Sequence, residues 1–327
     1  MPSVQKVHID KALSNISIGY QNEQYIANEI FKEVPVKKQS DRYYVYGMER
    51  FRQYDDLRAP GTEANEISWT LSDDSYFCEG HALRHAIADE EKQNADDTFD
   101  LEADGTELVT EGILLNKEVD AANKVLDTKN YHKDLQITLG ATDAPAKWSD
   151  YENSDPILDI KKAKEAIHRK SGLRPNTLII SEPVLNVLEL HPRLLDVIKY
   201  VQRGIVTKDL IAVAFGVDQI LVGSALKSNV TNQGQVEPGQ IEPLNYIWGN
   251  SAVLAYIPPR PAKKTPALGY SYMWDKDGNG PIQVRKWYEV GRRATIVEAE
   301  RWYSQEIVSN VAGFLFADVV DPLGTFK

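Results

Sequence analysis

The clearest hydrophobic pattern in the chain runs from Asp97 to about Asn130 and has the period of a helix. Apolar residues recur there at intervals of seven, four, three and four positions, at Leu108, Leu115, Val119, Ala122 and Leu126. Residues at this spacing share one face of an α-helix. The pattern predicts a long helix, roughly 45 to 50 Å in length if most of the segment is helical.

A second helix is predicted over residues 155–170, DPILDIKKAKEAIHRK. Asp155 has the side chain of an N-cap, and Pro156 suits the first helical position because its φ is fixed at a helical value. Gly172 follows the last turn, where glycine commonly ends a helix. Three independent signals therefore agree on both ends of this element.

Residues 41–78 predict a long two-stranded arm. An aromatic strand is expected near Tyr43 to Met48, a polar tip around Ala59 to Gly61, and a returning strand from Glu66 to about Cys78. The preceding residues 1–40 mix short apolar and polar pieces. They are expected to form an arm with one short helix, because they carry too few apolar side chains for a core of their own.

Strands and helices alternate after Gly172. The expected order is strand NTLII, helices PVLNVLEL and TKDLIAVAF, strand QILVGSAL, a polar loop, and strand YIWGNSAVLAYIPP. Strands are predicted again beyond this point, in PIQVRKWYEV, RRATIVEAERWYSQEIV and FLFADVV. Strand-rich sequence thus brackets an inserted α/β lobe, and the fold class is α+β.

Composition limits the class of protein. The 327 residues suggest about two domains, and no apolar run approaches the roughly 20 residues that span a bilayer. A single cysteine, Cys78, suits the reducing cytoplasm. The net charge of −11 opposes broad binding of phosphate groups. Much of this charge lies between Asp89 and Glu111, where ten residues are acidic and one, Lys92, is basic.

Two clusters resemble metal sites, and we predict that neither binds metal. Cys78, His81 and His85 supply at most three ligands from one stretch, which is not a closed zinc pattern; they are expected to be structural, with Gly80 ending the returning strand before the histidines. DKDGNG, residues 275–280, matches the first half of a calcium loop, but Lys286 stands where a glutamate should complete it. A hairpin turn between strands YSYMW and PIQV is preferred.

No motif demands an enzyme. The chain has no G-x-S-x-G and no P-loop, and its six histidines are scattered. The stretch from Gly291 to Arg293, near Trp287 and Tyr288, is expected to belong to a sheet face with paired charges. We therefore predict no catalytic residue, no metal and no cofactor.

The ordered set of elements resembles the major capsid proteins of tailed bacteriophages, the Hong Kong 97-like fold. The resemblance rests on NTLIISEPVLNVLELHP, then TKDLIAVAFGVDQILVGSAL, IWGNSAVLAYIPP and TPALGYSYMW, and it covers essentially the whole chain. It implies an N-terminal arm at 1–40, an extended loop at 41–88, a spine helix at about 97–130 and an axial domain at 173–261. Residues 89–172 and 262–327 would form the peripheral domain.

The resemblance also implies a structural function. The chain would assemble into hexamers and pentamers of an icosahedral shell around double-stranded DNA, without sequence-specific binding, in the host cytoplasm and then in the virion capsid. Expected partners are a portal protein and, in some cases, a decoration protein. A separate scaffolding protein is also expected, because the arm would begin at Met1 and leave no room for a fused scaffolding domain. An encapsulin-type cargo shell is the alternative reading, and a metal-dependent enzyme the third.

Two groups of residues are expected to serve assembly. The extended loop would contact neighbouring subunits through aromatic and basic side chains, namely Tyr44, Tyr46, Arg50, Arg52, Arg58 and Trp69. An acidic patch would face the shell interior and dock a scaffolding protein; it comprises Asp96, Asp97, Asp100, Glu102 and Asp104. Some family members weld subunits through a lysine in this loop, but no lysine lies between Lys38 and Lys92 here. That crosslink is not expected.

Overall fold

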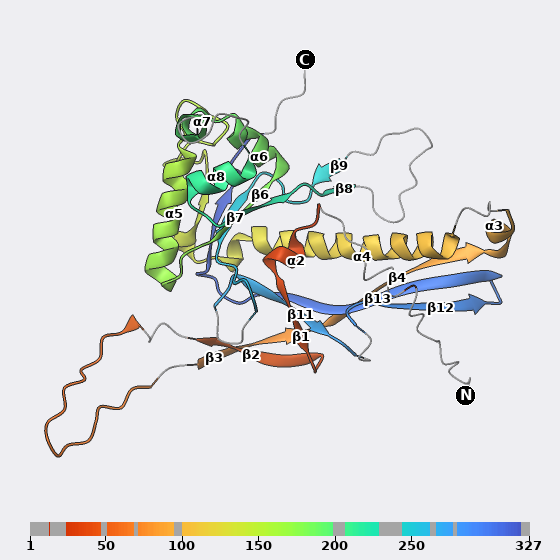
Figure 1. The fold of residues 1–327 in the computed structure, drawn as a ribbon, viewed down its shortest axis with the longest axis horizontal. Coiled ribbons are helices and arrows are strands. Elements are labelled where there is room, and N and C mark those ends of the chain that lie inside the picture. Colours follow the sequence, from red (N-terminus) through yellow and green to blue (C-terminus); the bar gives the residue numbers. More distant parts are fainter. Residues whose placement is uncertain are drawn as a thin grey trace.

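The computed structural model describes Leu13 and residues 24–46, 51–68, 71–94, 100–198, 207–228, 244–261, 266–276 and 280–321 (Figure 1). Its α-helices are α2 (Ala27–Ile30), α3 (Asp89–Asn94), α4 (Leu101–Leu126), α5 (Pro156–Ser171), α6 (Glu182–Glu189), α7 (Pro192–Ile198) and α8 (Lys208–Phe215). Two short 3-10 helices, η2 (Thr128–Asn130) and η3 (Lys133–Leu135), follow α4. The first strands are β1 (Lys32–Val36), β2 (Ser40–Tyr46), β3 (Leu71–Phe77), β4 (Glu79–Ala88), β5 (Gln136–Thr138), β6 (Thr177–Ser181) and β7 (Gln219–Gly223). The remaining strands are β8 (Leu226–Ser228), β9 (Leu244–Tyr246), β10 (Ala252–Ala255), β11 (Gly269–Trp274), β12 (Gln283–Glu289), β13 (Ala294–Ile307) and β14 (Gly313–Ala317).

The long helix α4 lies along a sheet of long strands (Figure 1). Asp100 is its N-cap and accepts hydrogen bonds from the backbone N–H groups of Glu102 and Ala103. The helix is confirmed, but it spans 101–126 and is about 39 Å long, shorter than the sequence suggested. It begins later than expected because the Asp100 cap fixes its first turn.

The buried face of α4 differs in part from the one that its apolar residues predicted. Leu108 is 61% exposed, whereas Thr106, Thr110, Lys117 and Glu118 are buried. Both threonine hydroxyls donate to the carbonyl four residues earlier, which satisfies them inside the helix. The apolar periodicity located the helix correctly: Ala122 is buried and Leu115, Val119 and Leu126 pack against the core, whereas Leu108 does not.

The sheet beneath α4 is organised around β13. Strand β4 pairs with one side of β13, while β11 and β12 pair end to end with its other side, and β1 adds in parallel to β11. Strands β11 and β12 are therefore both antiparallel to β13 and do not pair with each other. The predicted hairpin at 275–280 is wrong: β13, at 14 residues, is long enough to pair with two shorter strands in succession.

A second sheet forms the α/β lobe, in the order β5-β14-β10-β6-β7, with α5, α6, α7 and α8 packed on it (Figure 1). All three predicted signals of α5 are confirmed: Asp155 accepts from the N–H of Leu158, Pro156 is the first residue, and Gly172 ends the helix at φ 68°. The lobe's core also contains Trp148, from outside residues 173–261. The compact unit thus takes chain from both sides of the expected axial domain.

Strands β2 and β3 form a separate antiparallel pair, in register from Ser40 opposite Phe77 to Tyr46 opposite Leu71. The loop that joins these strands forms the end of the molecule opposite α3 (Figure 1). Among the described residues, no helix has the length and hydrophobicity needed to cross a membrane.

Candidate functional site

The most unusual surface of the molecule is the loop of residues 51–68, which joins the β2–β3 pair and projects away from both sheets (Figure 1). Every one of these residues is exposed. The exposed side chains include large apolar ones, and Leu57 has 85% of its surface in solvent. Large exposed apolar side chains are typical of surfaces that contact another molecule.

The tip of the loop is held by its own hydrogen bonds. Both the backbone N–H and the hydroxyl of Thr62 donate to the carbonyl of Ala59, at 3.2 and 2.8 Å. Gly61 provides the positive φ, 83°, that this tight turn needs. Asn65 donates its side-chain amide to the carbonyl of Asp55 across the loop, at 2.8 Å. The loop is thus shaped without being packed on a core.

The base of the loop is anchored by aromatic stacking. Tyr272 of β11 lies between Tyr43 of β2 and Tyr76 of β3, with ring centroids 5.6 and 4.5 Å apart. Cys78 is fully buried beside them, and burial raises the pKa of its thiol to about 11. This cluster fixes the direction in which the loop leaves the molecule.

Phe51 provides a second anchor where the loop begins. Its ring lies against Gly172 at the end of α5, so closely that a Cβ at Gly172 would be 2.7 Å from Cε1 of Phe51. Glycine is required at this position twice, by its positive φ and by this contact. The loop is therefore seated on the α/β lobe as well as on the strands.

The comparisons with known proteins agree with this geometry. No family model matches the chain. A "Major capsid protein" of Burkholderia phage BcepMu is 32% identical over 281 residues, which cover 85% of this chain and 86% of that protein. The chain belongs to the phage major capsid proteins. A second "Major capsid protein", from Pseudomonas phage JBD67, is 27% identical over 76% of this chain and 77% of its own length.

Solved structures show the same fold for this capsid protein. A phage-related protein from Bordetella bronchiseptica matches 96% of this chain and 98% of its own, with a TM-score of 0.74 and 26% identity. The capsid structure of Cyanophage P-SCSP1u matches 90% of this chain and 88% of its own, with a TM-score of 0.59 and 9% identity. An encapsulin from Synechococcus elongatus, at 9% identity and a TM-score of 0.51, shares the fold alone. The Hong Kong 97-like fold is confirmed, and the curated relatives are phage proteins.

The residues predicted to contact neighbouring subunits lie in or beside this loop. Arg52 and Arg58 are exposed within it. Tyr44 and Tyr46 belong to β2, where they pair with Asp73 and Leu71 of β3. Two further predicted residues, Arg50 and Trp69, lie outside the described residues. Their role in assembly stays a prediction.

Two residues of the predicted acidic patch make contacts within the subunit. Asp100 caps α4, and Glu102 accepts from Lys92 and from Lys286, each at 2.7 Å. These two cations hold the pKa of the Glu102 carboxyl below its usual range. Asp104 is exposed, while Asp96 and Asp97 lie outside the described residues. Asp100 is exposed as well, although its carboxylate is engaged in the cap of α4.

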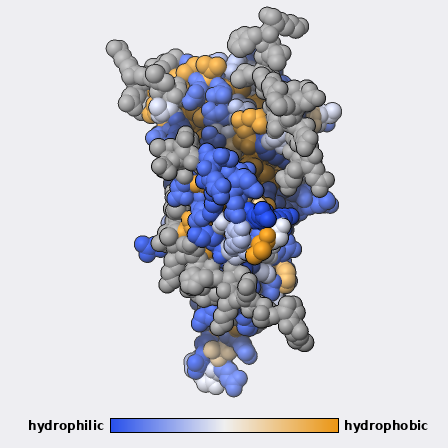
Figure 2. Space-filling model, turned by 90° about the vertical axis from the view of Figure 1, so that its right-hand side faces the viewer, coloured by the Kyte–Doolittle hydropathy of each residue, from blue (hydrophilic) through white to orange (hydrophobic). Residues whose placement is uncertain are grey.

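Exposed acid remains at the neighbouring helix α3. Glu90 and Glu91 are exposed, with Glu91 accepting from the N–H of Ala88, and Asp89 accepts a hydrogen bond from the hydroxyl of Tyr288 at 2.6 Å. This end of the molecule is mostly hydrophilic (Figure 2).

The Cys78, His81 and His85 cluster is spread along a strand. Gly80 does not end the strand as predicted; the break falls at Cys78, and β4 runs through both histidines. His81 and His85 are four residues apart, which in a strand is about 13 Å. His81 stacks on Tyr303 at 4.2 Å, and Cys78 donates weakly to the carbonyl of Tyr272. No group of three potential metal ligands is found in the described part of the chain.

One serine and histidine pair has the separation of a catalytic dyad. Ser154 Oγ lies 2.9 Å from Nε2 of the buried His191. The N–H of Arg193 donates to Nδ1 of His191, so this nitrogen accepts and Nε2 carries the proton. His191 then donates to Ser154, whose hydroxyl donates to the carbonyl of Asp150. A histidine in this state cannot deprotonate the serine, so the pair is structural.

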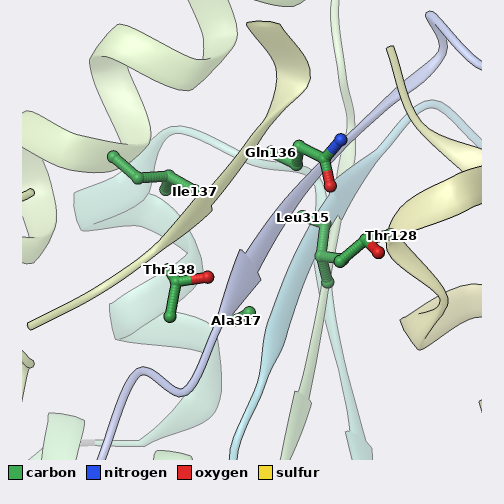
Figure 3. A pocket seen from close by; sticks show the side chains of 6 residues that line it. All are labelled: Thr128, Gln136, Ile137, Thr138, Leu315 and Ala317. Carbon is green, nitrogen blue, oxygen red and sulfur yellow. The ribbon is translucent and has the colours of Figure 1, made fainter. Parts of the chain in front are cut away.

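A shallow hollow lies beside β5 and β14 (Figure 3). It is lined by Thr128, Gln136, Ile137, Thr138, Leu315 and Ala317. None of these side chains titrates near neutral pH. The hydroxyl groups belong to Thr128 of η2 and Thr138 of β5, and the amide belongs to Gln136 of β5. The hollow offers neither a general acid nor a nucleophile with an activating base.

Sequence reasoning missed a group of buried charges. Lys117, Glu118 and Arg301 are at most 4% exposed, and Glu33 lies between Lys117 and Arg301. Burial lowers the pKa of Lys117 to about 8 and raises the pKa of Glu118. Lys117 and Glu118 lie beside the apolar stripe of α4 and not in it, so no local signal marked them.

Proposed function

We propose that this chain assembles with copies of itself into hexamers and pentamers of an icosahedral shell that encloses phage double-stranded DNA. The observation that carries this proposal is the uncovered loop of residues 51–68, with Leu57 at 85% exposure. A neighbouring subunit that buries the loop would remove this apolar area from water. The net charge of −11 suits a container that repels its DNA weakly and binds no particular sequence.

The contact has two parts in this proposal. The aromatic residues Tyr44, Tyr46 and Trp69 bury apolar area against the neighbour. Arg50, Arg52 and Arg58 pair with its acidic side chains and set the geometry more than the affinity. The function is structural, without catalysis.

Other components follow from the role of the shell. Assembly takes place in the host cytoplasm, around a separate scaffolding protein that docks on the acidic segment near α3 and α4. A portal protein occupies one vertex, and a decoration protein can bind outside. The acidic segment supports the scaffold contact because Glu90, Glu91 and Asp104 are exposed on it.

Deletion of residues 53–64 tests the loop. We expect a soluble subunit that melts cooperatively and no longer closes into shells, because the loop contributes no side chain to the described core clusters. Negative-stain microscopy measures closure, and calorimetry measures melting. The matched control replaces the same residues by glycine and serine at equal length, which separates loop length from side-chain contact. A deletion that unfolds the subunit, or one that still makes normal shells, would disprove the assignment.

A further inference from the structure

Glu118 joins three segments that are far apart in the sequence. Its Oε1 accepts from the backbone N–H of Ile26 at 3.0 Å and from Nε1 of Trp248 at 2.7 Å. Its Oε2 accepts from the N–H of Ala27 at 2.8 Å. The carboxylate therefore connects the arm, the helix α4 and the turn before β10. The side chain is completely buried.

The arm segment, residues 24–36, needs such a connection. Ile26 precedes α2, a helix of four residues, and makes no side-chain cap of its own. Glu118 supplies that cap from α4, and the adjacent Lys117 donates to Asn28 at 2.5 Å and to Glu33 at 2.8 Å. Consecutive residues of α4 thus bind the arm at the start of α2, within α2 and in β1.

Trp248 fixes the third segment just as firmly. Its ring packs so closely on β7 that a Cβ at Gly223 would lie 2.6 Å from Cγ of the indole. The indole N–H therefore cannot shift without movement of the lobe. A displacement of the lobe therefore changes the hydrogen bond from Trp248 to Glu118.

Stability does not explain a carboxylate at this position. Burial of an ionised group is costly, and an apolar side chain of similar volume is often equally stable. Burial raises the pKa of Glu118 despite its three donors, so the charged form still costs native-state free energy. Apolar contact is not directional, whereas three donors at fixed positions define one alignment of the chains. The carboxylate therefore fixes the register of the arm on α4.

We propose that Glu118 is a positioning residue that sets the register of the arm on α4 and couples the arm to the lobe through Trp248. The proposal concerns the single subunit and stands apart from the assembly contacts proposed above. Loss of the carboxylate would free the arm without unfolding the core.

Glu118→Gln tests whether the carboxylate sets the register of the arm. The glutamine amide keeps one acceptor oxygen but turns an NH₂ group toward at least one former donor. We expect hydrogen exchange of a peptide covering residues 24–31 to become at least tenfold faster, measured in the full chain against a peptide covering 117–125. The melting temperature should stay nearly unchanged, because the cost of the buried charge is removed as well. Unchanged exchange would overturn the proposal, as would equal acceleration in both peptides.

The matched control is Glu107→Gln, the same change at an exposed position of α4. It should alter neither exchange nor melting; acceleration of the arm by this control would also overturn the proposal.

Trp248→Phe tests the coupling. It removes the indole donor and leaves both arm N–H groups with their carboxylate oxygens. We expect exchange of residues 24–31 to rise at least threefold although Trp248 makes no hydrogen bond to them. The double variant should exchange no faster than Glu118→Gln alone, because both changes break one connection. Unchanged exchange in Trp248→Phe, or additive effects in the double variant, would refute the coupling. If Glu118→Gln does not fold, the exchange of residues 24–31 in Trp248→Phe alone decides whether the proposal holds.

Discussion

Gly269, the first residue of β11, lies where the arm meets the sheet under α4. A Cβ at this position would lie 2.5 Å from the carbonyl oxygen of Glu306 and would overlap the ring of Phe31. The carbonyl is part of the β11–β13 pairing and cannot withdraw. We expect Gly269→Ala to lower the free energy of unfolding by about 1 to 3 kcal/mol, as overpacking does. Denaturant titration measures it. The control is Gly291→Ala, with nothing within 4 Å, and equal effects of the two changes would contradict this account.

Single residues also show which features of a sequence are informative. Asp155, Pro156 and Gly172 mark α5 correctly because a cap, a proline and a left-handed glycine act within one turn of the chain. Lys117 and Glu118 resemble surface residues by type, since such side chains are seldom buried without partners. Their partners come from about 90 residues away, as in the bond from Ile26 to Glu118. No local pattern reveals them.

Elements were predictable where their pattern is local. The helices α4, α5, α6 and α8 and the strands β6, β12, β13 and β14 lie in the predicted segments. Helix α7 was missed, as was the pairing of β1 with β11, because a parallel partner more than 200 residues away leaves no turn signal between them. The placement of β11 and β12 end to end along one side of β13 was also missed. The sequence DKDGNG favours a turn but does not state which strands the turn joins.

The helix α3 carries a prediction about the scaffolding protein. Glu90 and Glu91 are its exposed acids, whereas Lys92 is held by Glu102 and by the hydroxyl of Thr295. We expect the double change Glu90→Lys and Glu91→Lys to reduce shell yield strongly in the presence of scaffolding protein. In the unmodified chain the yield should fall steeply with salt, because exposed charges are screened beyond roughly 10 Å at 0.1 M.

The control for this prediction is Glu152→Lys, an exposed reversal outside the acidic segment. Shell yield is measured by sedimentation across a salt series. A yield that ignores both salt and the α3 reversals would leave α3 as an ordinary solvated helix.

For the whole molecule, the order of elements was predictable, although the extent of each unit was not. The expected axial domain began at 173, yet α5 and Trp148 pack into the same core as β6 and β10. A core joins whatever apolar faces meet, and strand β14 returns to this sheet from the end of the described chain. The loop at 51–68 was anticipated because its mostly polar sequence lies between two predicted strands. The contact between Phe51 and Gly172 was not anticipated, because these residues meet only in the folded chain.

The loop gives the prediction that most directly joins the subunit to the shell. Arg52 and Arg58 are trypsin sites in an exposed, extended segment. We expect rapid cleavage after both in the free subunit and protection in the assembled shell, followed by mass spectrometry of the fragments. Shells dissociated in mild denaturant serve as the control and should regain cleavage. Equal cleavage rates in free and assembled protein would rule out the loop as a covered contact.

Protection could also arise if the loop merely faced the shell interior, and Leu57→Cys separates these causes. A photo-crosslinker attached at position 57 should join two subunits in the shell and none in the free chain. Labelling is selective because Cys78 is completely buried and burial raises the pKa of its thiol to about 11, so little reactive thiolate forms at neutral pH. The unmodified chain, treated in the same way, should give no crosslinked dimer. Protection from trypsin without crosslinking would place the loop inside the shell but away from its neighbours, and the proposed contact would then be wrong.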